Sequence, residues 1–186
     1  MQILLYLSYA LFVTIEVILS RAFRSTETDK KGTDKKSLSF LWITILVSIF
    51  LAVFVSKSIY YPVSSDSFTF YFGLIVLYLG LIIRIMAVLT LGKFFTVDVT
   101  IRDNHRLKKD GLFKYIRHPN YSALLLSFFG MALTFNNWIS LFLMVVPITI
   151  AFIVRINIEE KVLEQHFGEE YVSYCNETKR LIPFVY

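Results

Sequence analysis

The chain has 186 residues, of which 56% are hydrophobic and 18 are phenylalanine, and its net charge is +5. This composition excludes an ordinary water-soluble globular domain and predicts an integral membrane protein. The single cysteine excludes an internal disulfide, and the three histidines lack the i, i+4 spacing of a helical zinc site, so we expect no metal. The positive charge needs no nucleic-acid partner, because basic residues that flank membrane helices and face anionic lipids account for it.

Hydropathy predicts an all-α protein with a single transmembrane domain, residues 1–186, that crosses the membrane about five times. About 20 apolar residues make one crossing, and apolar runs occupy residues 3–20, 37–55, 68–91, 119–134 and 138–154. The first run lacks a basic start and a small-residue cleavage site, so we expect a retained helix and not a signal peptide. Only three residues separate the last two runs, which must therefore be antiparallel neighbours.

Two ionisable residues fall inside the predicted spans. Glu16 lies four residues before the end of the first span, and we expect it to snorkel towards the interface. Arg84 lies deeper in the third span, where a charge is expensive, and it is a candidate substrate-binding residue. It could pair with Glu16 or guide the anionic headgroup of a substrate, and the sequence leaves both options open.

The distribution of lysine and arginine predicts the orientation in the membrane. Residues 21–36, 93–117 and 155–180 hold 17 of the 19 basic residues, so we expect these segments on the cytosolic side. The N-terminus is then outside, and the C-terminal segment, residues 155–186, is cytosolic. The polar stretch at residues 25–36 is expected to be a flexible link whose charge holds this topology.

The motif "RHPNY" at residues 117–121 begins the fourth span. Pro119 suits the first position of a helix, because its missing N–H would have no partner there anyway, and this makes His118 the N-cap. Free backbone N–H groups and the positive end of the helix dipole then lie beside Arg117, as in an anion site. An ordinary helix start, with Arg117 snorkelling to lipid phosphates, is the alternative.

A second charged motif, "RINIEE" at residues 155–160, is expected at the same membrane depth. The two predicted spans that flank the turn have 16 and 17 residues, so Arg155 emerges level with His118. Arg155 and Glu159 stand at i, i+4 and share a helix face, with Glu160 beside them. A ligand that carries both an anion and a cation fits this set, and S-adenosylmethionine carries both. No G-x-G-x-x-G motif is present, which excludes a Rossmann-type nucleotide site.

Three segments, "GLFKYIRHPNY", "RINIEEKVLEQHFGEEYVSY" and "RLIPF", resemble the C-terminal core of the isoprenylcysteine carboxyl methyltransferase family, part of a wider group with phospholipid N-methyltransferases. The resemblance covers about residues 91–186 in the family's order and spacing. It implies a membrane methyltransferase that converts S-adenosylmethionine to S-adenosylhomocysteine and receives a lipophilic small molecule or a prenylated substrate sideways from the bilayer. A cytosolic loop and a C-terminal amphipathic helix would form the cofactor pocket.

The resemblance also implies roles for single residues. The cofactor would be bound by the residues that match the family's cofactor block: Gly111, Phe113, Arg117, His118, Pro119, Tyr121, Glu160, Leu181 and Pro183. Tyr171, on the apolar face of the C-terminal helix, is expected to line the same pocket. Arg155 and Glu159 match the catalytic pair that the family places near the methyl acceptor.

Two methyl acceptors make different demands on this catalytic pair, and the sequence leaves a small thiol or another lipid open as well. An isoprenylcysteine carboxylate, with a reference pKa of about 3.3–3.7 for a chain terminus, is ionised at neutral pH and needs Arg155 to hold it but no base. Glu159 would then orient Arg155 or balance the sulfonium. A phospholipid amine, such as phosphatidylethanolamine, would instead need Glu159 as a general base. We favour the carboxylate. A non-enzymatic transporter subunit or lipid-binding scaffold is the competing class, and the sequence leaves the oligomeric state open.

Overall fold

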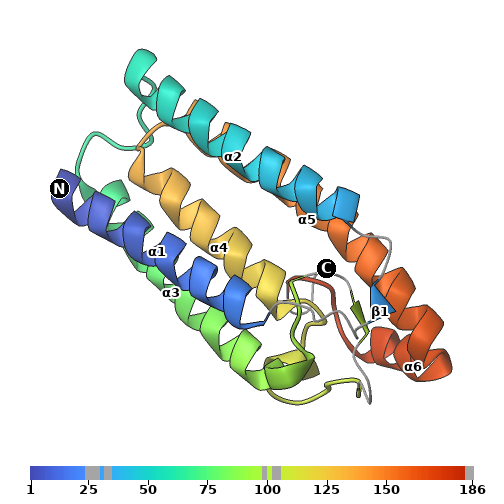
Figure 1. The fold of residues 1–186 in the computed structure, drawn as a ribbon. Helices are drawn as coiled ribbons and strands as arrows, with labels where there is room; N and C mark the ends of the chain where they lie inside the picture. The colour runs from blue at the N-terminus through green and yellow to red at the C-terminus, as the bar shows by residue number, and fades with distance from the viewer. Residues whose placement is uncertain (24–29, 32–34, 98–99, 102–105, 183–186) are drawn as a thin grey trace.

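The computed structural model describes residues 1–23, 30–31, 35–97, 100–101 and 106–182, and most of these are helical (Figure 1). Within these ranges the α-helices are α1 (Gln2–Ala22), α2 (Lys35–Ser58), α3 (Phe68–Leu91), α4 (Pro119–Thr134), α5 (Trp138–Phe167) and α6 (Glu169–Glu177). The segments between them contain the 3-10 helices η1 (Gly92–Phe94) and η2 (Gly111–Lys114) and two antiparallel strands, β1 (Lys30–Lys31) and β2 (Thr100–Ile101). Pro183 and most of the predicted flexible link, residues 25–36, lie outside the described residues.

The helices confirm the predicted fold class, and each predicted span coincides with one of them. Among the described residues, α1, α2, α3 and α5 are long and apolar enough to cross a membrane. α4 has only 16 residues, about 24 Å of helix against a hydrocarbon core of about 30 Å, so five crossings stay a prediction. α5 continues beyond residue 154 to Phe167, because no proline or glycine occurs in residues 155–167.

Helices α3 and α4 pack with their backbones in close contact. A Cβ atom at Gly130 of α4 would lie 2.3 Å from the amide nitrogen of Leu77 in α3, so only glycine fits there. α2 packs along α5, and α4 lies between this pair and the pair formed by α1 and α3 (Figure 1). The buried core follows these contacts and includes Leu77, Phe128, Met131, Ile148 and Phe152.

The two ends of the helix bundle differ. At one end, the turn between α4 and α5 is tied to the segment between α2 and α3, because Asn136 Oδ1 accepts hydrogen bonds from the Val63 and Ser64 amides at 3.1 and 3.0 Å. The other end, which we call the site end, carries the segment between α3 and α4 together with α6. The polar residues predicted to bind the cofactor belong to the site end.

Glu16 and Arg84 form a largely buried ion pair between α1 and α3. Nε and Nη2 of Arg84 donate to the two carboxylate oxygens of Glu16 at 3.1 and 3.2 Å, and the Arg84 and Glu16 side chains are 9% and 15% exposed. The guanidinium also lies 5.2 Å from the centre of the Phe95 ring. The prediction that Glu16 snorkels is therefore wrong, because a bidentate guanidinium within reach stabilises its charge inside the protein. Of the two options for Arg84, the structure shows the pairing.

Candidate functional site

The start of α4 fixes the position of the site. His118 is the N-cap of this helix and Pro119 is its first residue, as predicted. The His118 amide donates to the carbonyl of Arg180 at 3.0 Å, and Ser122 Oγ donates to the carbonyl of Leu181 at 2.6 Å. The described part of the C-terminal segment therefore folds back along the start of α4.

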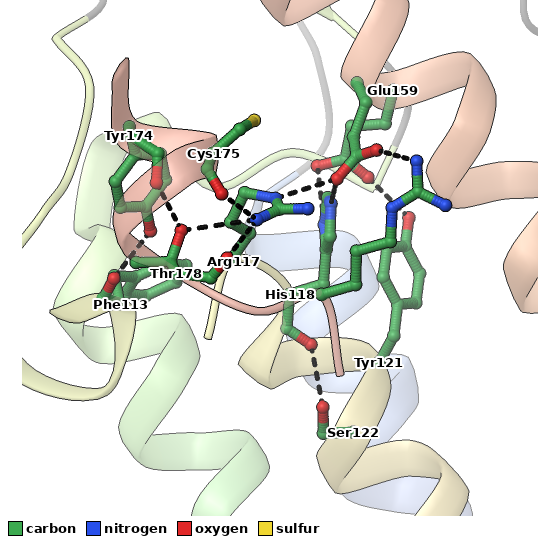
Figure 2. Close-up of polar contacts among 11 residues, drawn as sticks. Phe113, Arg117, His118, Tyr121, Ser122, Glu159, Tyr174, Cys175 and Thr178 are labelled. Carbon is green, nitrogen blue, oxygen red and sulfur yellow. Dashed lines mark hydrogen bonds and ion pairs between the residues drawn. The ribbon is translucent and has the colours of Figure 1, made fainter. Parts of the chain in front are cut away.

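Arg117 links the start of α4 to the end of α6 (Figure 2). Its Nη1 donates to the carbonyl oxygens of Cys175, at 3.1 Å, and of Thr178, while its Nε donates to Glu160 Oε1 at 2.9 Å. A guanidinium at this position also meets the negative end of the α6 dipole. These contacts give Arg117 a structural role that the sequence did not predict.

His118 lies beside both carboxylates of the second charged motif. Its Nε2 is 3.3 Å from Glu160 Oε1, and its Nδ1 is 4.0 Å from Glu159 Oε1. Tyr121 Oη, one turn further along α4, donates to Glu159 Oε2 at 2.8 Å (Figure 2). Glu160 Oε2 is also 2.7 Å from Arg180 Nη2. The predicted convergence of the two charged motifs is therefore confirmed, because α4 and α5 bring them into hydrogen-bond contact.

Arg155 lies one helical turn before Glu159 and is among the most deeply buried side chains, with 2% exposure. Its Nη1 donates to Ser37 Oγ at 2.8 Å, and its Nη2 donates to the Val97 carbonyl at 2.7 Å. A charge at this depth is costly unless it is hydrogen-bonded, and these two contacts meet that need. They also orient the guanidinium, because one partner comes from α2 and the other from the segment after η1.

Two buried tyrosines of α6 cover the site end. Gly168, whose φ is +55°, ends α5 and turns the chain into α6. Tyr174 Oη donates to the carbonyl of Phe113 at 2.6 Å. The Tyr171 hydroxyl lies near the Cys175 thiol but makes no hydrogen bond of normal geometry within the described residues. Burial raises the pKa of both phenols, so each keeps its proton at neutral pH.

A cavity of about 350 Å³ opens among these side chains. At the site end its lining is polar and charged and includes Arg117, His118, Tyr121, Arg155 and Glu159. From there it extends between α1 and α2, where the lining is apolar and includes Phe12, Val13, Val17, Leu41, Ile45 and Ile49. One space therefore joins a charged end to a hydrocarbon-lined part, which is the form of a site for an amphiphilic ligand.

The cavity divides the predicted site residues into two groups. Those that line it are Arg84, Phe113, Arg117, His118, Tyr121, Arg155, Glu159 and Tyr171. In the described part of the chain, those that do not line it are Gly111, Pro119, Glu160 and Leu181. Neighbouring helical residues point about 100° apart, so Glu159 faces the cavity while Glu160 faces Arg117 and Arg180. Pro183 lies outside the described residues.

Similarity to known proteins extends over nearly the whole chain. The model of the isoprenylcysteine carboxyl methyltransferase family matches residues 73–165. Protein-S-isoprenylcysteine O-methyltransferase B of Arabidopsis thaliana is 31% identical over 188 residues, which cover 97% of this chain and 92% of the relative. The chain belongs to the isoprenylcysteine carboxyl methyltransferase family. It is therefore an enzyme of a methyltransferase family, and the competing class of a transporter subunit or scaffold is not supported.

Other relatives in the isoprenylcysteine carboxyl methyltransferase family match a smaller part of this chain. Protein-S-isoprenylcysteine O-methyltransferase of Saccharomyces cerevisiae is 32% identical over 115 residues, which cover 61% of this chain and 48% of the relative. A solved structure of a eukaryotic intramembrane Ras methyltransferase of this family has a TM-score of 0.62 and 25% identity over 81% of this chain. The chain spans about half the length of that protein, 53%. The shared fold and the apolar helices show an integral membrane protein.

Two residues in and beside the cavity of this family member were not predicted from the sequence. Asn120 lines the cavity and is 9% exposed, and its Oδ1 has no hydrogen-bond partner among the described residues. It lies inside "RHPNY", where an amide in the first turn of a membrane helix is itself a functional signal. Ser37 gave no such signal, because it orients Arg155 from 118 residues away in the sequence.

Proposed function

We propose that the protein transfers a methyl group from S-adenosylmethionine to the carboxylate of an isoprenylcysteine-like acceptor. The observation that supports this most strongly is the cavity, whose charged end continues into an apolar part between α1 and α2. The acceptor has the same division, because a carboxylate is joined to a long hydrocarbon chain. Relatives that are named protein-S-isoprenylcysteine O-methyltransferases support a carboxylate acceptor over a phospholipid amine.

The residues at the charged end fit S-adenosylmethionine as the methyl donor. Asn120 Oδ1 and Tyr171 Oη are buried polar atoms without a hydrogen-bond partner among the described residues, and both side chains line the cavity. A buried polar group is costly while it is unpaired, so each is suited to bind a polar group of the donor. His118 and Phe113 would complete the donor site from α4 and η2. When bound, the donor would supply an electrophilic methyl group on a sulfonium.

Arg155 and Glu159 are assigned to the acceptor side of the site. Arg155, fixed by Ser37 and the Val97 carbonyl, would hold the acceptor carboxylate within the cavity. Glu159, oriented by the Tyr121 hydroxyl, would balance the positive charge of the donor. A carboxylate that is already ionised needs no general base, so these residues would act by positioning and by exclusion of water.

The orientation and the domain organisation belong to the same proposal. Residues 21–36, 93–117 and 155–180 hold 17 of the 19 lysines and arginines, which supports a cytosolic site end and an N-terminus outside. We assign residues 1–186 to a single transmembrane domain with five crossings, and residues 91–186 to its methyltransferase core. A prenylated substrate would then enter the apolar part of the cavity from the membrane lipids.

Binding and turnover measurements test this function. We expect calorimetry in detergent to show that the folded protein binds S-adenosylhomocysteine, and we expect reconstituted protein to methylate N-acetyl-S-farnesylcysteine. Phosphatidylethanolamine in the same assay serves as the amine acceptor and should remain unmethylated. Methylation of phosphatidylethanolamine instead would show that the acceptor is an amine and not a carboxylate. Failure of the folded protein to bind S-adenosylhomocysteine would exclude the proposed donor.

A further inference from the structure

Helix α1 forms one wall of the apolar part of the cavity, although little of α1 is buried. Only Ser8 and Phe12 of this helix are buried residues. Its second half contributes Val13, Glu16, Val17 and Ser20 to the cavity lining, and α2 provides the facing wall. The spacing between α1 and α2 therefore sets the width of the cavity, and α1 is the wall with the weaker support from the core.

Polar links attach α1 to the rest of the bundle at two levels. In its first half, Ser8 Oγ and Tyr78 Oη of α3 share a hydrogen bond of 2.8 Å, and neither residue lines the cavity. In its second half, Glu16 is bound by both Nε and Nη2 of Arg84, and both residues line the cavity. The second link therefore holds the part of α1 that matters for the cavity.

Stability alone does not explain why a charged pair occupies this position. A buried ion pair gains little over apolar residues of similar size, because the desolvation of both charges offsets their attraction. Its better-attested effect is to fix one arrangement of the packed elements. The bidentate geometry suits this role, because two parallel hydrogen bonds define both the distance and the rotation between two groups. Arg84 also packs on the Phe95 ring, whose centre lies 5.5 Å from that of Phe23 directly after α1.

We propose that the Glu16–Arg84 pair is a positioning pair that holds the second half of α1 against α3 and thereby sets the width of the apolar cavity. It does not hold the acceptor carboxylate, because Arg84 uses two of its nitrogens on Glu16 and is 7% exposed. The pair acts on the hydrocarbon chain of the acceptor by placing the wall that this chain contacts. This inference rests on the proposed function, since it assigns the apolar part of the cavity to the chain of the acceptor.

The kinetic test replaces both charges together. The double variant Glu16→Leu/Arg84→Met leaves no unpaired charge in the membrane, so it should fold. Loss of roughly 50 Å² of apolar contact with the acceptor chain corresponds to about a tenfold increase in KM. We expect this increase for N-acetyl-S-farnesylcysteine, with a smaller one for the shorter geranyl analogue. The kcat and the affinity for S-adenosylhomocysteine should stay within about twofold. The matched control Ser8→Ala/Tyr78→Phe removes the other link between α1 and α3 and should leave KM unchanged.

A distance measurement tests the proposal independently of enzymatic activity. Spin labels at Ile18→Cys in α1 and Ile43→Cys in α2, in a Cys175→Ser background, report the spacing across the cavity, and both positions are exposed. We expect a longer and broader distance distribution in Glu16→Leu/Arg84→Met, but not in Ser8→Ala/Tyr78→Phe. If the double variant does not fold, Arg84→Lys keeps the charge without the bidentate contact and should broaden the distribution as well.

The outcomes separate this inference from the proposed function. An unchanged distance distribution, or an unchanged KM in active protein, would overturn the positioning role. A changed distribution in a protein that binds S-adenosylhomocysteine but never methylates a prenylcysteine would overturn the proposed acceptor and leave the positioning of α1 established.

Discussion

Asn120 is a residue whose importance becomes visible only in the structure. Its side chain lines the cavity, and its Oδ1 accepts no hydrogen bond within the described residues. An unpaired buried acceptor costs about 1–3 kcal/mol. A ligand that donates to this atom would recover that free energy on binding, so we expect Asn120 to contribute to affinity without being needed for the fold.

We predict that Asn120→Leu weakens the binding of S-adenosylhomocysteine about tenfold, the equivalent of one hydrogen bond of about 1.4 kcal/mol. The free energy of unfolding should stay the same or rise, because an unpaired acceptor is removed from the interior. Titration calorimetry and thermal unfolding measure the two effects. Thr69→Val is the matched control, since the Thr69 hydroxyl is also buried without a partner among the described residues but does not line the cavity. Equal effects of both substitutions on affinity would contradict this role for Asn120.

Arg155 is the second residue whose environment gives a sharp expectation. Its guanidinium is held at both ends by Ser37 and Val97, and a lysine cannot make both contacts. We predict that Arg155→Lys lowers kcat/KM for the carboxylate acceptor about a hundredfold, the size of effect that a misplacement of about 1 Å produces. The affinity for S-adenosylhomocysteine should change much less.

Arg180→Lys provides the comparison for Arg155→Lys. Arg180 belongs to the same charged cluster through its contact with Glu160, but it does not line the cavity. Its substitution should change kcat/KM only a few-fold. If Arg155→Lys keeps full activity, Arg155 does not hold the carboxylate.

At the scale of elements, α6 is the part of the site that depends most on one backbone conformation. Gly168 has φ +55° and ψ −129°, a region that residues with a side chain rarely enter. It ends α5 and places Tyr171 and Tyr174 over the cavity. Arg117 then fixes the far end of α6 by its hydrogen bonds to the carbonyls of Cys175 and Thr178. Helix α6, which covers the site, is therefore fixed at both ends.

We predict that Gly168→Ala destabilises the placement of α6 by about 1–3 kcal/mol, the cost of a residue held in a disfavoured backbone region. Hydrogen exchange of the α6 amides should become faster, and the affinity for S-adenosylhomocysteine should fall, while the long helices keep their protection. Gly92→Ala is a close control, because Gly92 ends α3 with φ +53° and ψ −125° and its Cβ would also meet no atom within 4 Å. A loss of affinity from Gly92→Ala but not from Gly168→Ala would show that α6 is not the cover.

Some elements of the site could be predicted from the sequence because local chemistry determines them. The helix start at Pro119 follows from the missing N–H of proline. The meeting of Arg155 with the start of α4 follows because Pro119 and Arg155 lie at similar helical distances from the turn between α4 and α5. The sequence could not predict which of Glu159 and Glu160 faces the cavity. Both are carboxylates, and only the packing of α5 decides which one reaches the cavity. The contacts of Arg117 with α6 likewise require the tertiary structure.

At the scale of the whole molecule, we expect the short helix α4 to place the site below the membrane surface. Its 16 residues cover about 24 Å of the roughly 30 Å hydrocarbon core. α5 starts from the same turn but has 30 residues, so it continues past the start of α4. His118 and Tyr121 therefore lie in a recess at the site end, walled by the second half of α5 and covered by α6. In such a recess a polar donor could bind from the aqueous side while a lipid-borne acceptor binds from the membrane.

The orientation of the molecule decides whether this recess opens to the cytosol. Basic residues concentrate in residues 21–36, 93–117 and 155–180, so we predict that the site end is cytosolic. Tyr60, 89% exposed at the opposite end, and Asn176, exposed on α6, provide reporter positions. In right-side-out vesicles and a Cys175→Ser background, a membrane-impermeant maleimide should label Tyr60→Cys directly and Asn176→Cys only after permeabilisation. The reverse pattern would place the charged end of the cavity outside, where it could not draw on a cytosolic methyl donor.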